Sequence, residues 1–318
     1  MFYGLLISVG VGLVLLWPGL HLLRKLHTGQ EVREELPSTH NKKAGTPTMG
    51  GAIFVIAATI SSFILAKFFF TMTDQSVFWW QLYGLWTFAI IGFADDFIKV
   101  VLHNPYGLPG RWTVILQVLV SVPFLYFNFG KLPPVFGNLW IDSVFYLFVI
   151  IAVVNAVNLT DGLDGLAAGS SLITFSFMLP LIVAGNANAT PLTVAMIGSL
   201  AAFLVVNFKP AKCWMGNLGS NALGGLMVFT AIYAGRIWLF ALGIGLFIIE
   251  NLSVTIQVSY FKYTKYCTKE KVGKRIFLFT PIHHHFELLG WPEVRIILVF
   301  WSVAVLFGGA MLALFYLL

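Results

Sequence analysis

The chain has 318 residues, of which 58% are hydrophobic and only 10% are charged, and its formal net charge is +6. A soluble domain of this size could not bury so much apolar surface, so the composition excludes a water-soluble globular protein and indicates a membrane protein. The basic residues lie in short stretches between apolar segments. This placement points to membrane topology, lipid headgroups and phosphorylated substrates, and not to nucleic acid.

Apolar segments of about 20 residues follow one another along the chain, each long enough to cross a bilayer as a helix. The first segment has no basic region before it and no cleavage site after it, so we interpret it as a retained membrane helix. The sequence predicts one all-α transmembrane domain over residues 1–318. Its ten helices are expected near 2–23, 50–70, 78–98, 114–130, 143–158, 166–184, 192–208, 222–235, 237–261 and 295–317.

Most Lys and Arg residues fall in four alternate loops, 24–48, 99–113, 209–221 and 262–294. The excess of positive charge on cytoplasmic loops places these four loops in the cytoplasm. With ten spans, both termini are then expected on the outer face. Polar motifs share the inner face, where we expect catalytic loops near 24–49, 99–113, 159–165, 209–221 and 262–294.

Two adjacent carboxylates, Asp95 and Asp96, end the third predicted helix and are followed by Lys99. Acidic side chains at a helix C-terminus oppose the helix dipole, so another group must stabilise them. An ion pair between Asp95 and Lys99, four residues apart, is one solution. The alternative, which we favour, is a role in binding a divalent metal or a phosphate group.

The fifth predicted helix runs into a stretch with two amides, Asn155 and Asn158, and two acids, Asp161 and Asp164. Its Asp-Gly-Leu-Asp-Gly sequence is also compatible with an ordinary turn. Beside a second acidic pair on the same membrane face, however, it becomes a candidate for Mg²⁺, which takes one or two carboxylates together with substrate phosphates. The stretch has no basic residue, which favours a cation or a nucleoside as its ligand.

Two loops combine basic residues with glycines ahead of a predicted helix, residues 40–51 and 207–221. Free N–H groups before a helix can bind an anion, and Trp214 could stack on a base. An interfacial Trp beside a helix cap is the alternative interpretation, and topology alone explains the lysines of the first loop.

Near the C-terminus, Glu250 and Gln257 are seven residues apart and share one face of a predicted helix. A buried acid there indicates either a functional group or a hydrogen bond between helices. Three consecutive histidines follow at 283–285. Zn²⁺ binding is conceivable, but neighbours in sequence rarely point to one centre, so we favour hydrogen bonding to phosphate or carboxylate groups.

These blocks, in this order, resemble the phospho-N-acetylmuramoyl-pentapeptide transferases, a family of polyprenyl-phosphate sugar-1-phosphate transferases. The resemblance covers nearly the whole chain, and the triple histidine separates it from relatives that use N-acetylglucosamine. The matching motifs are residues 45–51, 95–96, 155–165, 207–211, 273–277 and 281–287.

The resemblance implies an enzyme of the bacterial inner membrane with a cytoplasmic Mg²⁺ site and a bent ninth helix beside a lipid groove. It implies transfer of phospho-MurNAc-pentapeptide from UDP-MurNAc-pentapeptide to undecaprenyl phosphate, which forms lipid I and UMP during peptidoglycan synthesis. A homodimer is also a family expectation. Contacts with membrane lipids follow from the spans themselves.

The family's site residues transfer to this chain position by position. Asp95, the usual candidate base, Asp96 and His283 are expected to be catalytic. Substrate binding is expected, from the resemblance and from the residues themselves, at Lys43, Asn155, Asn158, Asp161, Asn207, Trp214, Gln257, His284 and His285. Metal binding is expected at Asp161, Asp164 and Asn217.

Three positions depart from the family pattern. Asn217 stands where the family has a metal-ligating aspartate, Thr113 replaces a lysine of the nucleotide pocket, and Val299 replaces an arginine of the last helix. An amide keeps an oxygen for Mg²⁺ but lacks the charge that holds a hard cation. A catalytically impaired homologue is therefore one alternative function. A secondary transporter is another, although its binding acids would lie near the bilayer midplane.

Overall fold

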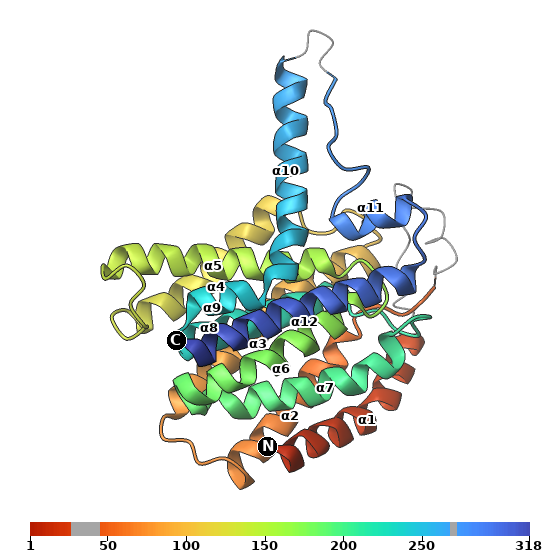
Figure 1. Ribbon diagram of the computed structural model, residues 1–318. Coiled ribbons are helices and arrows are strands. Elements are labelled where there is room, and N and C mark those ends of the chain that lie inside the picture. Colours follow the sequence, from red (N-terminus) through yellow and green to blue (C-terminus); the bar gives the residue numbers. More distant parts are fainter. Residues whose placement is uncertain (27–44, 268–271) are drawn as a thin grey trace.

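The computed structural model describes residues 1–26, 45–267 and 272–318, and within these ranges the regular elements are helices. Most of the long helices lie side by side in one bundle, from which α10 projects (Figure 1). The elements are α1 (Phe2–Lys25), α2 (Gly51–Phe68), α3 (Gln75–Val100), α4 (Gly110–Phe127), α5 (Leu139–Thr160), α6 (Leu166–Asn186), η2 (Ala187–Ala189), α7 (Thr190–Asn207), α8 (Gly216–Ala234), α9 (Ile237–Gly243), α10 (Gly245–Cys267), α11 (Ile282–Leu288) and α12 (Glu293–Leu317).

The helices confirm a polytopic all-α membrane protein. Among the described residues, seven helical stretches are long and apolar enough to cross a membrane, or eight with the bent pair of α9 and α10. One of the seven, 166–207, contains both α6 and α7. Each predicted span has a helical counterpart here, with α9 and α10 together forming the ninth. The count of ten spans and the outward position of the termini remain predictions.

Helix α8 begins at Gly216, earlier than the predicted start at 222, so the expectation of a loop up to residue 221 is wrong. The stretch is rich in Gly, Asn and Ser, which lowers its hydropathy and made it look like a loop. The glycines instead allow close packing between backbones, as small residues do in membrane helix bundles. A side chain on Gly51 would collide with the backbone of Gly219, and one on Gly92 with that of Asn217.

Nearly every residue of α8 after its first turn is buried, which places this helix at the centre of the bundle. Its neighbours include α2, α3, α5 and α6. Aromatic rings fill the space around it, and Phe229 contacts Phe88 of α3 and Phe124 of α4. The N-terminus of α8 therefore lies at the end of the bundle where α3 and α5 finish.

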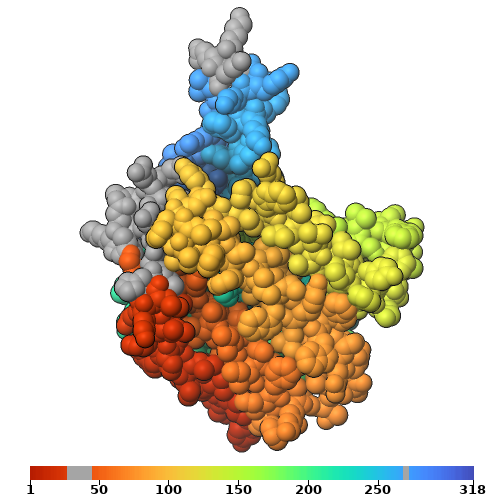
Figure 2. Space-filling view, turned by 180° about the vertical axis from the view of Figure 1, so that it is seen from behind, coloured from red at the N-terminus to blue at the C-terminus, as the bar shows by residue number. Residues whose placement is uncertain are grey.

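A sharp bend of 76° separates α9 from α10 at Gly243–Gly245, as expected for the ninth span. Both glycines pack closely on α12, because an added side chain would collide with Met311 at position 243 and with Phe307 at position 245. Beyond the bend, α10 and the chain that returns from it stand away from the body of the protein (Figures 1 and 2). One helix thus leaves the bundle close to the predicted cytoplasmic motifs.

Candidate active site

The carboxylate of Asp96, near the C-terminus of α3, meets the N-terminus of α8. It accepts hydrogen bonds from the backbone N–H groups of Asn217 (3.0 Å) and Leu218 (2.9 Å). These two N–H groups belong to the first turn of a helix, where they have no partner within the helix and the dipole is positive. This contact supplies the stabilisation that an acid at a helix C-terminus requires.

Asp95, its neighbour, is stabilised by three donors. Lys99 Nζ lies 2.5 Å from its Oδ2, which confirms that the two residues form an ion pair. The backbone N–H of Leu108, in the loop after α3, donates to Oδ1 at 2.6 Å, and the side-chain amide of Asn217 donates to Oδ2. Asp95 is consequently held between α3, the following loop and α8.

The amide of Asn217 links Asp95 to α5. Its Oδ1 accepts from Nδ2 of Asn158 at 3.0 Å, and the same Asn158 nitrogen donates to Ser220 Oγ at 2.9 Å. Asn155, one turn earlier on α5, donates to Gln117 of α4 at 2.8 Å. Hydrogen bonds thus join polar side chains of α3, α5 and α8, and a separate pair one turn earlier joins α5 to α4.

Sequence reasoning missed two members of this polar network, Gln117 and Ser220. Gln117 is completely buried in an apolar part of α4, and Ser220 is completely buried in α8. An amide inside a membrane helix was the available signal for Gln117. No such signal marked Ser220, because its stretch of sequence looked like a loop.

Asp161 directly follows α5 and lies close enough to Asp96 of α3 to feel its charge. The residue is partly exposed, but its carboxyl group is enclosed by protein. Burial raises the pKa of Asp161 to about 7, and the negative charges of Asp96 and Asp164 add to the rise, while Lys99 opposes it. A bound cation stabilises the ionised form of such an acid, because the cation neutralises several carboxylates together.

Asp164 fastens the loop between α7 and α8 to the turn between α5 and α6. Its Oδ2 accepts from the N–H of Ala211 at 3.1 Å, and its Oδ1 accepts from Nε1 of Trp214 at 3.2 Å. Its own N–H donates to Oε1 of Glu293 at 3.1 Å, and Glu293 also pairs with Lys209. The hydrogen bond from Trp214 to Asp164 fixes the position of the Trp214 ring.

Sequence reasoning also missed Glu293, the partner of Lys209. Glu293 is buried in the first turn of α12, so a lone acid at the start of an apolar helix was the signal available. Asn207, expected to bind substrate, is buried, and its amide donates to the carbonyl of Cys213 at 3.0 Å, within the same loop. Lys43 lies outside the described residues.

The three consecutive histidines point to three different partners. His283 Nδ1 lies 3.0 Å from Glu250 Oε1, and His284 Nδ1 lies 2.6 Å from Glu287 Oε2. The ring of His285 accepts the N–H of Leu278 at 3.1 Å. Two of the three therefore bond to carboxylates, as predicted.

Gln257 binds the backbone of the returning chain. Its Oε1 accepts from the N–H groups of Ile276 (2.9 Å) and Phe277 (3.0 Å), and its Nε2 donates to the carbonyl of Phe277 at 2.9 Å. Gln257 and Glu250 are both buried on the same side of α10, as their spacing predicted. Together they hold residues 276–283 against this helix.

Helix α11 in turn lies over the turn that carries Asp161. The nearest atom to a side chain built on Gly162 is Nε2 of His283, with Nε2 of His284 a little farther away. Asp95 and Asp96 join this region through α8 and through the charge that Asp96 exerts on Asp161. His283 and the acidic motifs therefore lie at the same end of the bundle.

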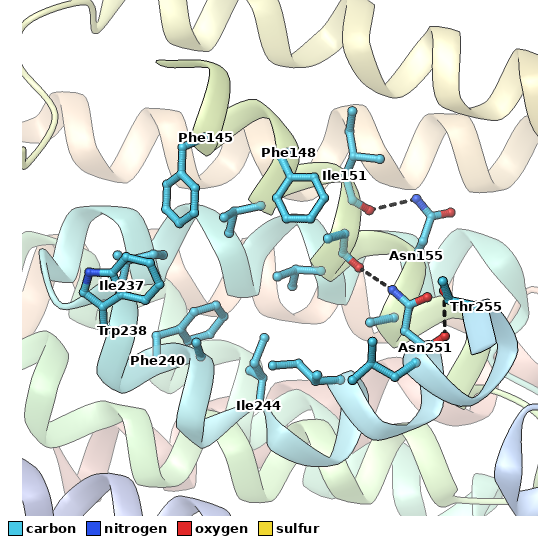
Figure 3. Close-up of a pocket in the computed structure, with 17 residues that line it drawn as sticks. Phe145, Phe148, Ile151, Asn155, Ile237, Trp238, Phe240, Ile244, Asn251 and Thr255 are labelled. Atoms are coloured by element: carbon cyan, nitrogen blue, oxygen red, sulfur yellow. Dashed lines mark hydrogen bonds between the residues drawn. The ribbon is translucent and has the colours of Figure 1, made fainter. Parts of the chain in front are cut away.

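An apolar groove of about 560 Å³ runs between α5 and the bent pair α9 and α10. Phe145 and Trp238 lie toward one end, whereas Asn155, Asn251 and Thr255 gather at the other (Figure 3). Asn155 stands one turn from Asn158. The polar end of the groove therefore leads to the acidic cluster.

Comparison with known proteins gives the family. Residues 78–235 match glycosyl transferase family 4, and residues 43–55 match signature 1 of the phospho-N-acetylmuramoyl-pentapeptide-transferases. The chain is 38% identical to the phospho-N-acetylmuramoyl-pentapeptide-transferase of Bacillus subtilis (strain 168), over 95% of this chain and 93% of the relative. The relative of the same name from Lacticaseibacillus paracasei is 43% identical over 92% and 91%. The one from Listeria monocytogenes is 41% identical over 88% and 87%.

The chain belongs to the phospho-N-acetylmuramoyl-pentapeptide-transferase family. It is therefore a membrane-integral transferase of peptidoglycan synthesis, which sets aside the secondary transporter. The position of the acids agrees, because Asp95 and Asp96 lie in the last two turns of α3 and Asp161 follows the end of α5, away from the middle of either helix. The comparisons give no support to an impaired homologue.

Two of the other positions that depart from the family pattern lie in helices α4 and α12. Thr113 lies in the first turn of α4, and Val299 lies on an exposed face of α12. In the first turn of α12, Arg295 stacks on Trp291 with 4.3 Å between the guanidinium carbon and the ring centre. Val299 is 39% exposed, so this position presents an apolar side chain on the surface of α12.

The donor set suits the Mg²⁺ that the family implies. In the described part of the chain, no three His, Cys, Asp or Glu side chains lie close enough together to hold a metal ion by themselves. Mg²⁺ does not require such a cage, because it binds one or two carboxylates and completes its shell with water and substrate phosphates. The enclosed carboxyl of Asp161, with its raised pKa and two acidic neighbours, meets that requirement.

Proposed function

We propose that this protein transfers phospho-MurNAc-pentapeptide from UDP-MurNAc-pentapeptide to undecaprenyl phosphate, forming lipid I and releasing UMP. One observation carries the proposal: acids from α3 and from the turn after α5 converge at the N-terminus of α8, beside the polar end of an apolar groove. A water-soluble sugar nucleotide and a lipid phosphate could meet there. We expect the protein in the bacterial inner membrane, with both termini outside.

The groove between α5 and α10 is the proposed binding site for the polyprenyl chain. Its lining is almost entirely apolar, which suits a hydrocarbon, and Asn155, Asn251 and Thr255 mark the end suited to the phosphate. The Nδ2 of Asn251 already donates to the carbonyl of Ala152 at 3.5 Å, so its Oδ1 remains available as an acceptor. The lipid phosphate would then lie next to Asn158.

The sugar nucleotide would occupy the opposite, cytoplasmic side of the acidic cluster. Trp214 is partly exposed, and Asp164 holds its ring in place, so it suits stacking against the uracil. His284, His285, Lys43, Asn207 and Gln257 complete the proposed binding residues, with Asn207 and Gln257 acting by holding their loops.

Phosphoryl transfer requires two anions to be placed in line and their charge to be neutralised. Mg²⁺ bound by Asp161, Asp164 and Asn217 would supply that neutralisation on the pyrophosphate. An oxygen of the lipid phosphate attacks the phosphorus that carries the sugar, and UMP leaves. Asp96 holds the N-terminus of α8 in place, and thereby also Asn217.

Asp95 is the proposed base for the lipid phosphate. Lys99, Leu108 and Asn217 already donate to its oxygens, so these donors compete with the proton that Asp95 would take up. A phosphate monoester has its second pKa near 6, so the lipid phosphate is already mostly dianionic at neutral pH. The base therefore matters most at acidic pH.

The test is lipid I formation by the purified protein in detergent or nanodiscs. Radiolabelled UDP-MurNAc-pentapeptide, undecaprenyl phosphate and Mg²⁺ should give a labelled lipid, and omission of the polyprenyl phosphate should abolish it. Asp161→Asn should reduce the product strongly, because it removes the carboxylate that interacts with both Asp96 and Asp164. Absence of labelled lipid from the folded protein under all Mg²⁺ concentrations would refute the proposal.

A further inference from the structure

Glu250 of α10 and His283 of α11 form a buried pair. The proposed reaction gives the contact between these two side chains no role. Both side chains are completely buried, and Oε1 of Glu250 lies 3.0 Å from Nδ1 of His283. The other oxygen of Glu250 and the other nitrogen of His283 have no hydrogen-bond partner in the described part of the protein. Burying two such groups is costly, so the pair requires a reason.

The contact decides which nitrogen of His283 carries the proton. An ionised carboxylate can only accept a hydrogen bond, so opposite an ionised Glu250 the donor is Nδ1. The free Nε2 is then an acceptor in the neutral ring, or a donor when the ring is doubly protonated. Without Glu250, the ring could adopt the opposite tautomer or rotate.

The free nitrogen also has a defined direction. Nε2 of His283 lies against Gly162, and a side chain at that position would collide with it. Gly162 is the residue next to Asp161, whose carboxyl is close enough to Asp96 of α3 to feel its charge. The imidazole is therefore aimed at the turn where the pyrophosphate of the donor substrate is proposed to bind.

The helix that carries Glu250 also lines the groove. Ile248, Asn251, Leu252 and Thr255 of α10 face the groove, whereas Glu250, Ser253 and Gln257 are buried on another side. One rigid helix thus borders the lipid site and holds His283 and residues 276–277. Such a helix can fix the histidine relative to the lipid.

We infer that Glu250 is a positioning residue, which holds His283 with Nδ1 protonated and Nε2 directed at the donor phosphates beside Asp161. The inference rests on the proposed function for the identity of those phosphates. Glu250 itself does not touch substrate. A plain tether between α10 and α11 is the competing explanation, and it predicts loss of stability without any specific dependence on His283.

A double-mutant cycle separates the two. Glu250→Met should lower kcat for lipid I formation about 10- to 100-fold, the usual effect of removing the carboxylate behind a working histidine, with little change in KM for the sugar nucleotide. Glu250→Gln keeps an oxygen that can accept from Nδ1 and should restore most of kcat. In the background of His283→Asn, adding Glu250→Met should change kcat by less than about twofold.

The matched control is Gln81 of α3, a completely buried side chain that bonds to the carbonyl of Ala189 and to Thr230. Gln81→Met removes a buried tether far along the chain from the site. It should lower Tm, leave kcat of the folded enzyme nearly unchanged, and combine additively with His283→Asn. Equal losses of kcat from Glu250→Met with and without His283 would overturn the inference.

A second readout does not depend on activity. Solid-state NMR of ¹⁵N-histidine protein in nanodiscs, with His283 identified from the difference to His283→Asn, reports which ring nitrogen is protonated. We expect a protonated Nδ1 in the wild type and in Glu250→Gln, and its loss in Glu250→Met. A bare Nδ1, or a signal that Glu250→Met leaves unchanged, would refute the positioning role. Failure of the wild type to make lipid I would instead refute the proposed function.

Discussion

Asn217 offers the sharpest test of the site, because its amide is the centre of the polar network. The amide donates to Asp95 and accepts from Asn158 at 3.0 Å. Asn217→Asp replaces the donor with a second carboxylate. Two unit charges about 4 Å apart repel by about 4 kcal/mol at an effective dielectric constant near 20. Lys99, paired with Asp95, and the partial exposure of Asn217 reduce this, so we expect roughly 1–3 kcal/mol of destabilisation without a divalent cation.

A cation bound between these carboxylates relieves that repulsion. Each 1.36 kcal/mol corresponds to a factor of ten in binding, so the Mg²⁺ concentration for half-maximal lipid I formation should fall about tenfold or more in Asn217→Asp. Its Tm should be lower than that of the wild type in EDTA and should rise more on addition of Mg²⁺. Asn128→Asp, the same exchange at the end of α4 distant from Asp95, is the control and should not alter the Mg²⁺ midpoint. An unchanged midpoint in Asn217→Asp would show that this position does not ligate the metal.

Other consequences follow from single residues. Asp95→Asn should reduce activity more near pH 6 than at high pH, where the lipid phosphate is already ionised; an equal fractional loss would contradict the base assignment. Because the pKa of Asp161 is raised to about 7, Mg²⁺ must displace its proton below that pH. Mg²⁺ affinity should therefore fall up to about tenfold per pH unit below 7, and calorimetry should find this dependence weakened in Asp161→Asn. Cys267 is exposed, whereas Cys213 is buried and burial raises the pKa of its thiol to about 12, so maleimide should label one thiol per folded chain; rapid labelling of both would refute this.

The membrane helices could be predicted from the sequence because their signal is local. An apolar stretch of about 20 residues has few alternatives to a membrane span. The start of α8 could not be predicted in the same way. Its residues 216–221 are polar or small, and only the close approach of Gly51 and Gly92 from other helices turns this stretch into a packed helix end.

The site was predicted as a set of residues, but the role of each one depends on contacts between distant segments. Asp96 was predicted from its motif, but the sequence did not show that two backbone N–H groups of α8 donate hydrogen bonds to it. Asp164 and Gln257 were expected to bind ligands directly, whereas their side chains also hold loops in place. Glu250 could be singled out as a buried acid, but its partner His283 lies 33 residues away, at the far end of a loop.

The central claim is that the acids and amides at the ends of α3 and α5 and the start of α8 transfer a sugar phosphate onto a lipid bound in the adjoining groove. Measurement of UMP release from UDP-MurNAc-pentapeptide, with and without undecaprenyl phosphate, tests it most directly. We predict release by the wild type only when the polyprenyl phosphate and Mg²⁺ are both present, and very little in Asp161→Asn. Release that does not depend on the polyprenyl phosphate, or that Asp161→Asn leaves intact, would contradict the claim.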